Sequence, residues 1–162
     1  MLHLIPAPAH RAAFRLAHAL RKLWWRVRKP DLAGCRVIAR DSAGRVLLVR
    51  HSYGSRRWML PGGGLKRGEN AVAAAAREFA EETGCALERP RLVSVNSEPL
   101  FGAVNAVHIV AGGCTGTPQA DGREILAAEF FDPANLPGGC AQGLREALPA
   151  WLTAAEAASP PE

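Results

Sequence analysis

Three glutamates lie within five positions of one another in the stretch REFAEETG, which runs from Arg77 to Gly84. If this stretch is helical, Glu78, Glu81 and Glu82 share one face, because residues three and four apart are neighbours on a helix. Like charges at that spacing repel each other by about a few tenths of a kcal/mol per pair. A hard divalent cation would offset this repulsion, since Mg²⁺ prefers oxygen ligands and is often held by a few carboxylates together with substrate phosphates. The spacing therefore indicates a metal site that could bind a polyphosphate and activate a water.

A glycine-rich run, PGGGLKRGE, ends at Glu69 just before these glutamates. A backbone without side chains lets its own carbonyl and amide groups approach a metal or phosphate closely. The ordinary alternative is a solvated acidic helix face beside a Gly-Pro turn. The pair Glu81-Glu82 alone does not distinguish the two interpretations.

The glutamates need a helix to carry them, and the flanking residues predict one over residues 71–83. Asn70 is a suitable N-cap, the alanines that follow are strong helix formers, and Gly84 stands where a glycine commonly ends a helix. The apolar side of this helix is expected nearly opposite the carboxylates, and its residues are Val72, Ala75, Ala76, Phe79 and Thr83.

The remaining pattern predicts strands around this helix. Two β-rich runs within residues 35–51 flank a turn-forming cluster at 41–44 and indicate a hairpin. A basic loop, 52–57, and a short strand, WML, follow. Further strands are expected over 91–96, 103–112 and 127–132, with a closing helix over 144–158 in which Pro149 is a weak point. This alternation indicates an α/β (α+β) fold with a mixed β-sheet.

Bulk properties fit a single domain of 162 residues. No apolar run approaches the ~20 residues needed to span a bilayer. The four cysteines are scattered without a CxxC pair, so neither a zinc site nor a disulfide framework is indicated, and a cytoplasmic location fits best. We divide the chain into an N-terminal segment, residues 1–30, a main domain, residues 31–157, and a disordered tail, residues 158–162.

The net charge of +5 comes from the N-terminal segment, which holds seven Lys or Arg and no acid. Its pattern predicts an amphipathic helix with an apolar side made by Leu16, Leu20, Leu23, Trp24 and Val27. Packing on its own domain or in a homodimer is the simplest role. Contact with an anionic membrane surface or with RNA, or a transit peptide, would fit the same charge pattern.

From Gly63 to Cys85 the chain reads G-x5-E-x7-R-E-x-x-E-E-x-G-x. This pattern resembles the signature of the Nudix hydrolases at all seven defining positions: Gly63, Glu69, Arg77, Glu78, Glu81, Glu82 and Gly84. Phe79 and Cys85 replace the aliphatic residues that are commoner at two further positions. Both remain apolar, so the chemistry of the pattern is unaffected.

The resemblance implies an α/β/α sandwich and hydrolysis of a diphosphate bond in a nucleoside diphosphate linked to another group, with Mg²⁺ or Mn²⁺. It implies Glu78, Glu81 and Glu82 as metal ligands, with the Gly63 carbonyl completing the set. Glu69 would pair with Arg77 and fix the glycine loop against the helix, or would itself reach a metal.

The family takes its general base either from this helix or from a later loop, where Glu124 is the candidate in this chain. A solvated loop acid is the alternative for Glu124, and Glu98 and Glu129 are weaker candidates. Substrate contacts are expected from the basic loop: Arg56 and Arg57 on phosphates, and Tyr53 or Trp58 stacked on a base. His51 and His108 lie in strand-like settings and are expected to be packed rather than catalytic.

The substrate does not follow from these residues. Two substrate classes are candidates. One is ADP-ribose, which is suggested only by Pro99 beyond the signature, and the other is the free nucleoside triphosphates. The alternative functions are a nucleotide-sensing module that does not hydrolyse, and an RNA 5′-end pyrophosphohydrolase. A sensor commonly loses signature carboxylates, and this chain keeps all four.

Overall fold

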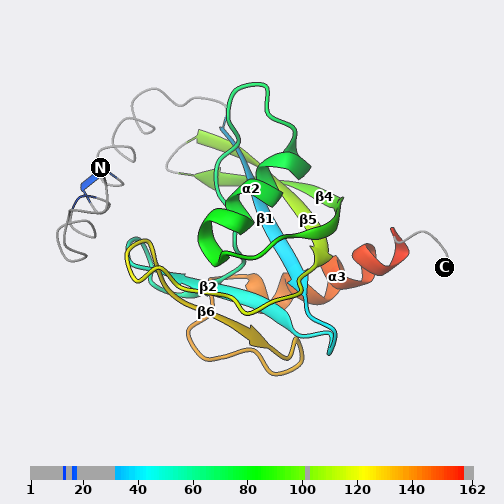
Figure 1. Cartoon of the computed structure of the whole chain (residues 1–162). Coiled ribbons are helices and arrows are strands. Elements are labelled where there is room, and N and C mark those ends of the chain that lie inside the picture. Colours follow the sequence, from blue (N-terminus) through cyan, green and yellow to red (C-terminus); the bar gives the residue numbers. More distant parts are fainter. Residues whose placement is uncertain (1–12, 14–15, 18–31, 101–102, 159–162) are drawn as a thin grey trace.

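The computed structural model describes residues 13, 16–17, 32–100 and 103–158 (Figure 1). Its strands are β1 (Leu32–Arg40), β2 (Val46–His51), β3 (Trp58–Met59), β4 (Glu88–Leu100), β5 (Ala103–Gly113) and β6 (Ile125–Phe131). Its helices are α2 (Ala71–Thr83) and α3 (Leu144–Ala157). The predicted hairpin, carboxylate helix and closing helix are all present, and the strand predicted over 91–96 is part of a longer one.

The β1–β2 hairpin turns where the sequence predicts it. Asp41 organises the turn, because its Oδ1 accepts hydrogen bonds from the backbone N–H groups of Ala43 and Arg45. Gly44 has φ +78°, a conformation that few residues other than glycine adopt at low cost. The two strands pair only at Arg40 and Val46, next to the turn, and they diverge from there.

The glycine loop occupies the place beside β1 that β2 leaves. Cys35 N donates to the Gly63 carbonyl at 2.8 Å, Val37 N donates to the Pro61 carbonyl at 2.8 Å, and Leu65 N donates to the Ala33 carbonyl at 2.9 Å. These ladder-like bonds satisfy the backbone of β1, which would otherwise be unpaired along that edge. These bonds therefore fix the position of the glycine loop alongside β1.

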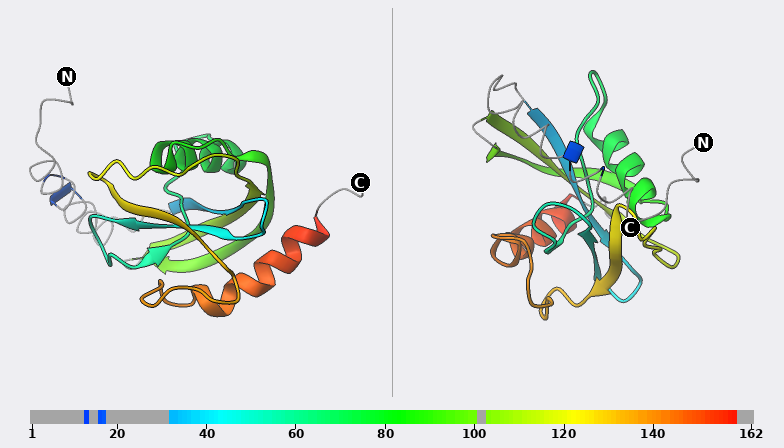
Figure 2. Two further views of the ribbon diagram at one scale, coloured as in Figure 1. Left: turned by 60° about the horizontal axis from the view of Figure 1, so that its bottom comes forward. Right: turned by 90° about the vertical axis from the view of Figure 1, so that its left-hand side faces the viewer.

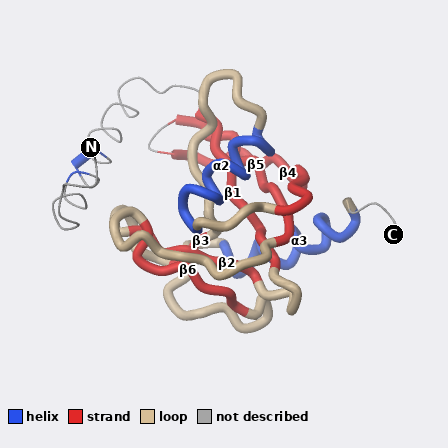
Figure 3. The backbone as a smooth tube through the Cα atoms, viewed as in Figure 1, coloured by secondary structure: helices blue, strands red, loops and turns tan. Residues whose placement is uncertain are grey.

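The strands form one mixed sheet, as predicted, in the order β3-β2-β1-β5-β4, with β6 paired to β2 (Figure 3). β1 and β5 run parallel, from the pair Leu32–Asn105 to the pair Arg40–Gly113. The pairings of β4 with β5, and of β2 with β1, β3 and β6, are antiparallel.

The two helices cover opposite sides of the strands, which gives the α/β/α sandwich (Figure 2, left). On one side Ala75 and Phe79 of α2 are fully buried in a cluster with Val37 of β1. On the other side Leu144 and Leu148 of α3 are buried in a second cluster. Because side chains alternate along a strand, neighbouring residues of β1 serve the two clusters in turn.

Helix α2 begins and ends at the predicted residues. Asn70 Oδ1 accepts hydrogen bonds from Val72 N at 2.9 Å and Ala73 N at 3.4 Å, and Gly84 closes the helix in the left-handed conformation at φ +69°. Both caps satisfy backbone groups that a helix end leaves without partners. Helix α3 tolerates Pro149 within its span.

The predicted N-terminal helix falls almost entirely outside the described residues. Ala13, Leu16 and Ala17 are helical and exposed, and the rest of residues 1–30 lies outside the description, as do residues 159–162 of the predicted tail. In the described part of the chain, no helix is long and apolar enough to cross a membrane.

Candidate active site

The glycine loop and α2 approach each other too closely for side chains in the loop. A Cβ on Gly63 would lie 2.5 Å from the Glu78 carboxyl group, and a Cβ on Gly62 would overlap the backbone carbonyl of Cys35. Gly62 also has φ +144°. The loop therefore brings bare backbone against the carboxylate face of the helix, which is the arrangement that the sequence predicts for metal or phosphate binding.

Arg77 is the centre of the outer part of the site. Its Nε donates to Glu69 Oε1 at 2.9 Å and its Nη2 donates to Glu69 Oε2 at 2.8 Å, a bidentate pair. Nη2 also donates to the Gly64 carbonyl at 3.3 Å, and Nη1 donates to Glu78 Oε1 at 2.6 Å. Hydrogen bonds from Arg77, and then from the backbone of Lys66, lower the pKa of Glu69 to about 2. The glycine loop is thereby tied to the helix by a fully charged pair.

Glu82 forms the inner part of the site and is 7% exposed. The sequence places the carboxylates opposite the apolar side of α2, but the last turn buries Glu82 beside Thr83. Glu82 Oε2 accepts a hydrogen bond from Gly62 N at 2.9 Å, and Oε1 lies 3.2 Å from His51 Nε2. Burial, opposed by the hydrogen bond from Gly62 N and reinforced by the negative charges of Glu78, Glu124 and Glu81, raises the pKa of Glu82 to about 8.

Glu81 points toward solvent, with 60% of its side chain exposed, and lies 3.6 Å from Arg77 Nη1. Among the three helix glutamates, one is therefore buried, one is held by an arginine and one is exposed. The three share a helix face but differ in environment.

Glu124 lies close enough to the helix for its charge to act on Glu82. Tyr53 Oη donates a hydrogen bond to Glu124 Oε1 at 2.8 Å. The structure thus joins two residues that the sequence assigns to different roles, Tyr53 to base stacking and Glu124 to proton transfer or metal binding. Glu129, a weaker candidate, is an exposed residue in the middle of β6.

The other residues of the basic loop lie elsewhere. Arg56 is exposed at φ +50°, and Arg57 lines a hollow beside the start of α3. Trp58 packs edge-on against Phe131 with 4.9 Å between ring centroids, so it contributes to the core. His108 is also a packed residue, with Nδ1 3.2 Å from the Gly34 carbonyl.

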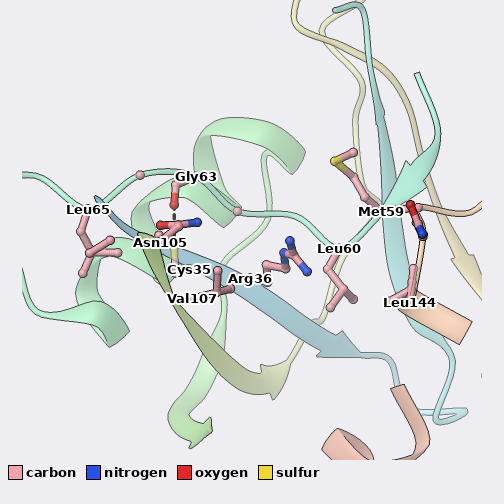
Figure 4. A pocket seen from close by; sticks show the side chains of 15 residues that line it. Cys35, Arg36, Met59, Leu60, Gly63, Leu65, Asn105, Val107 and Leu144 are labelled. Atoms are coloured by element: carbon pink, nitrogen blue, oxygen red, sulfur yellow. Dashed lines mark hydrogen bonds between the residues drawn. The ribbon is translucent and has the colours of Figure 1, made fainter. Parts of the chain in front are cut away.

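A cavity of about 450 Å³ borders the glycine loop on the α3 side of the sheet (Figure 4). Met59, Leu60, Val107 and Leu144 give it an apolar lining. Its polar side chains are Arg36, Asn105 and Gln142. Since Gly62 and Gly63 line the cavity and also contact the carboxylates, the loop is common to both.

The residues fit a divalent metal by two observations. Gly63 leaves room for a ligand directly beside the Glu78 carboxylate, where any Cβ would intrude. Glu82 is buried among negative charges that an added cation would balance. As the side chains lie, no three His, Cys, Asp or Glu residues in the described ranges are assembled closely enough to hold an ion, and Glu78 is paired with Arg77.

Sequence reasoning missed two features of the site. The sequence predicts that His51 is packed rather than catalytic; it is buried, and its ring also contacts Glu82. Its position at the end of β2, just before the basic loop, is the one available signal. Arg36, Asn105 and Gln142 come from segments far apart in the sequence, so no local pattern could have identified them. All four cysteines lie in the described part of the chain and are free thiols there.

Comparison with known proteins identifies the same region. The model of the NUDIX domain matches residues 31–151. A putative 8-oxo-dGTP diphosphatase of Bacillus subtilis is 34% identical over 105 residues, which cover 64% of this chain and 68% of that protein. An RNA pyrophosphohydrolase of Teredinibacter turnerae is 39% identical over 59 residues, 36% of this chain and 34% of that protein.

The fold has close counterparts among solved structures. The crystal structure of a MutT NUDIX hydrolase from Burkholderia pseudomallei superposes with a TM-score of 0.65 and 27% identity, and the match covers 74% of this chain and 97% of that one. Because the family model covers all the strands of the sheet and α2, which together build the site, the chain belongs to the Nudix hydrolase family.

Proposed function

We propose that the protein is a divalent-metal-dependent pyrophosphohydrolase that cleaves a diphosphate bond in a nucleotide, with nucleoside triphosphates as the favoured substrate class. The observation that carries the proposal is the placement of Glu82, a buried carboxylate with its pKa raised to about 8, against Gly62 N in the same loop whose next residue, Gly63, lies directly beside the Glu78 carboxylate. Burying such a group among like charges is costly unless a bound cation balances them.

Glu78, Glu81 and Glu82 would hold the ion, together with the Gly63 carbonyl. Mg²⁺ or Mn²⁺ at this position would neutralise charge on the phosphates and acidify a water for attack on phosphorus. Glu78 would exchange its contact with Arg77 for the ion. Arg77 would remain tied to Glu69 through the bidentate pair, so the glycine loop would keep its place during the reaction.

Glu124 would take the proton of the attacking water. It comes from the loop before β6 and not from α2, and it lies near enough to influence Glu82. Its carboxylate accepts one hydrogen bond, from Tyr53, on Oε1. The second oxygen is then available to a water, which is the geometry that a general base requires.

The nucleoside would occupy the cavity beside the glycine loop. A volume of about 450 Å³ with an apolar lining and a few polar groups is typical of a small-molecule site. Asn105 and Gln142 offer both hydrogen-bond donors and acceptors for a base edge, and Arg36 adds a positive charge. This placement puts the phosphates over Gly62 and Gly63, between the cavity and the carboxylates.

The name of the Bacillus relative supports a nucleoside triphosphate, including an oxidised one, over ADP-ribose. An RNA 5′ end is the second candidate, supported by the Teredinibacter relative over 59 residues only. A sensing module without turnover is the remaining alternative, and it is disfavoured because all four signature glutamates are present.

The test is a measurement of phosphate and pyrophosphate release from a substrate panel with Mg²⁺, with Mn²⁺ and with EDTA. The panel contains the nucleoside triphosphates, 8-oxo-dGTP, ADP-ribose, NADH, sugar nucleotides and 5′-triphosphorylated RNA. Metal-dependent release from a triphosphate well above the others is expected. Binding of Mg²⁺ and nucleotide by the folded protein without any release would contradict hydrolysis and indicate a sensor.

A further inference from the structure

The loop that carries Glu124 is fixed by local hydrogen bonds, most of them to the side chain of Asp121. Asp121 Oδ1 accepts hydrogen bonds from the N–H groups of Arg123 at 2.9 Å, Glu124 at 3.0 Å and Ile125 at 2.9 Å. Gly122, at φ +66°, closes the turn by donating to the Ile125 carbonyl at 2.9 Å. The main chain at Glu124 is thus held by a compact turn at the start of β6.

The end of β2 is attached to this turn. Ser52 N donates to the Glu124 carbonyl at 2.8 Å, immediately after a register shift between Arg50 and His51 in the β2–β6 pairing. Such a shift re-aims the side chains that follow it. It places Tyr53 where its hydroxyl reaches Glu124 Oε1 at 2.8 Å.

Tyr53 also contacts the inner end of the site. Its ring packs edge-on against His51, with 5.1 Å between the ring centroids. His51 in turn lies 3.2 Å from Glu82. One short segment, residues 51–53, therefore contacts both Glu82 and Glu124.

A carboxylate beside other carboxylates would lower its energy by turning away from them into water. Glu124 has this option, because it is only partly buried. The Tyr53 hydroxyl opposes the rotation, since it fixes one oxygen at hydrogen-bond distance and leaves the other unconstrained by that bond.

We propose that Tyr53 is a positioning residue for the reaction: its hydroxyl holds Glu124 facing the metal site so that the second carboxylate oxygen receives the proton of the attacking water. This inference rests on the proposed function and replaces the role in base stacking that the sequence suggests. Tyr53 touches neither the metal nor the substrate in this arrangement. Its effect passes through Glu124.

The decisive variant is Tyr53→Phe, which removes the hydroxyl and keeps the ring against His51. Using the best substrate of the panel and saturating Mg²⁺, we expect kcat to fall by roughly 10-fold or more, the scale seen when an orienting partner of a metal-site group is lost. KM should change less than about twofold, since no substrate contact is removed. Thr115→Val is the matched control, because Thr115 donates to Glu88 in a hydroxyl–carboxylate pair outside the site.

A double-mutant cycle separates positioning from general damage. Glu124→Gln should lower kcat further than Tyr53→Phe, and the double variant should be no slower than Glu124→Gln alone. Crystal structures of the metal-free wild type and Tyr53→Phe provide a readout independent of turnover, with Glu124 expected to leave its single position in the variant. Thermal midpoints of all variants check that the fold is intact.

Three results would overturn the inference. One is a Tyr53→Phe variant with wild-type kcat, and a second is an additive effect of Tyr53→Phe and Glu124→Gln. The third is a raised KM in Tyr53→Ala with normal kinetics in Tyr53→Phe, which would restore the stacking role. Each of these results requires an active wild type. If the wild type releases no phosphate from any substrate, the proposed function is wrong, and the inference about Tyr53 is wrong with it.

Discussion

The outer and inner ends of the candidate active site each hold a glutamate, and the two glutamates are in opposite electrostatic states. At the outer end Glu69 is paired with Arg77, and its pKa is lowered to about 2. At the inner end Glu82 is buried near Glu78, Glu124 and Glu81, and its pKa is raised to about 8. At the outer end Arg77 already balances the charge of Glu69, whereas at the inner end Glu82 faces the His51 ring and forms no ion pair with a Lys or Arg of the described residues.

This difference separates support from chemistry. The carboxylate of Glu69 is already paired with Arg77, and this pair holds the glycine loop in place. Its charge is balanced, so it does not require a metal ion. A carboxylate held at high cost beside others of its kind is a sign of a site that binds something positive. We therefore assign the outer pair to support and the inner group to metal binding, and the following changes test that division.

The largest effect is expected from Glu82→Gln at the inner end. The substitution keeps the size and one hydrogen-bond acceptor for Gly62 N but removes the charge. Metal-dependent turnover should fall by more than roughly 100-fold, beyond the usual loss for orienting partners of metal ligands. Steady-state kinetics and calorimetric titration with Mn²⁺ would measure turnover and affinity.

Glu129→Gln is the control for this change, because Glu129 is an exposed acid on β6. Near-normal turnover in Glu82→Gln, with a folded protein, would remove Glu82 from the ligand set.

A smaller loss, on the order of 10- to 100-fold, is expected from Gly63→Ala. The new Cβ would lie 2.5 Å from the Glu78 carboxyl group, so the loop or the helix must shift. Gly68→Ala is the control for a general effect of replacing a loop glycine. Gly68 also has a positive φ, +76°, but a Cβ there would meet nothing within 4 Å. Gly68→Ala should cost about 1–2 kcal/mol in stability and keep the turnover per folded molecule. Equal losses of turnover in the two variants would argue against a specific cradle.

At the outer end, Arg77→Lys should reduce turnover by several-fold and lower the thermal midpoint. Lysine keeps the charge but cannot reproduce the bidentate bonds to Glu69 together with the contacts to Glu78 and the Gly64 carbonyl. Arg67→Lys, at an exposed position of the same loop, is the matched control. If Arg77→Lys loses as much turnover as Glu82→Gln, then the outer end does more than support the loop, and our division between the two ends is wrong.

The last prediction concerns the stability of the protein in EDTA as a function of pH and involves no turnover. The pKa of Glu82 is raised from 4.5 to about 8 in the folded state, so its contribution is fully present below about pH 4.5 and is lost as the pH rises through 8. The slope can reach about 1.4 kcal/mol per pH unit. Glu69, lowered to about 2, acts in the opposite direction, since its contribution is lost as the pH falls through that value.

Denaturant unfolding of the wild type and Glu82→Gln would measure this slope. The range from roughly pH 5 to pH 8 is chosen because it lies between the ordinary pKa of a glutamate and the raised pKa of Glu82. The wild type should lose stability with rising pH and the variant should lose less. Parallel curves would mean that Glu82 is not buried as described.

The sequence predicted the elements whose signals are local. Asn70, the alanines and Gly84 define α2 to the residue, and the Asp41 turn defines the hairpin, because capping and turn chemistry act over a few positions. The glycine spacing identified the loop for the same reason.

Features set by tertiary packing could not be predicted. The burial of Glu82 depends on how the last turn of α2 meets the end of β2, and this contact is invisible in the helical pattern of α2 alone. The meeting of Tyr53 with Glu124 depends on the β2–β6 register shift. Stacking on a base was the reasonable expectation for an aromatic residue in a basic loop, since nothing near Tyr53 in the sequence indicates its partner.

The parallel pairing of β1 with β5 has a consequence for the order of folding. The pair Leu32–Asn105 closes a loop of roughly 70 residues, which contains β2, the glycine loop, α2 and β4. Contacts of such long sequence separation form slowly, because the entropy of closing the loop is lost before the pairing compensates for it. The β1–β2 hairpin and α2 can form early and locally, but the glycine loop is fixed over β1 only when β1 itself is placed. Recovery of metal binding during refolding should therefore lag behind recovery of helical signal.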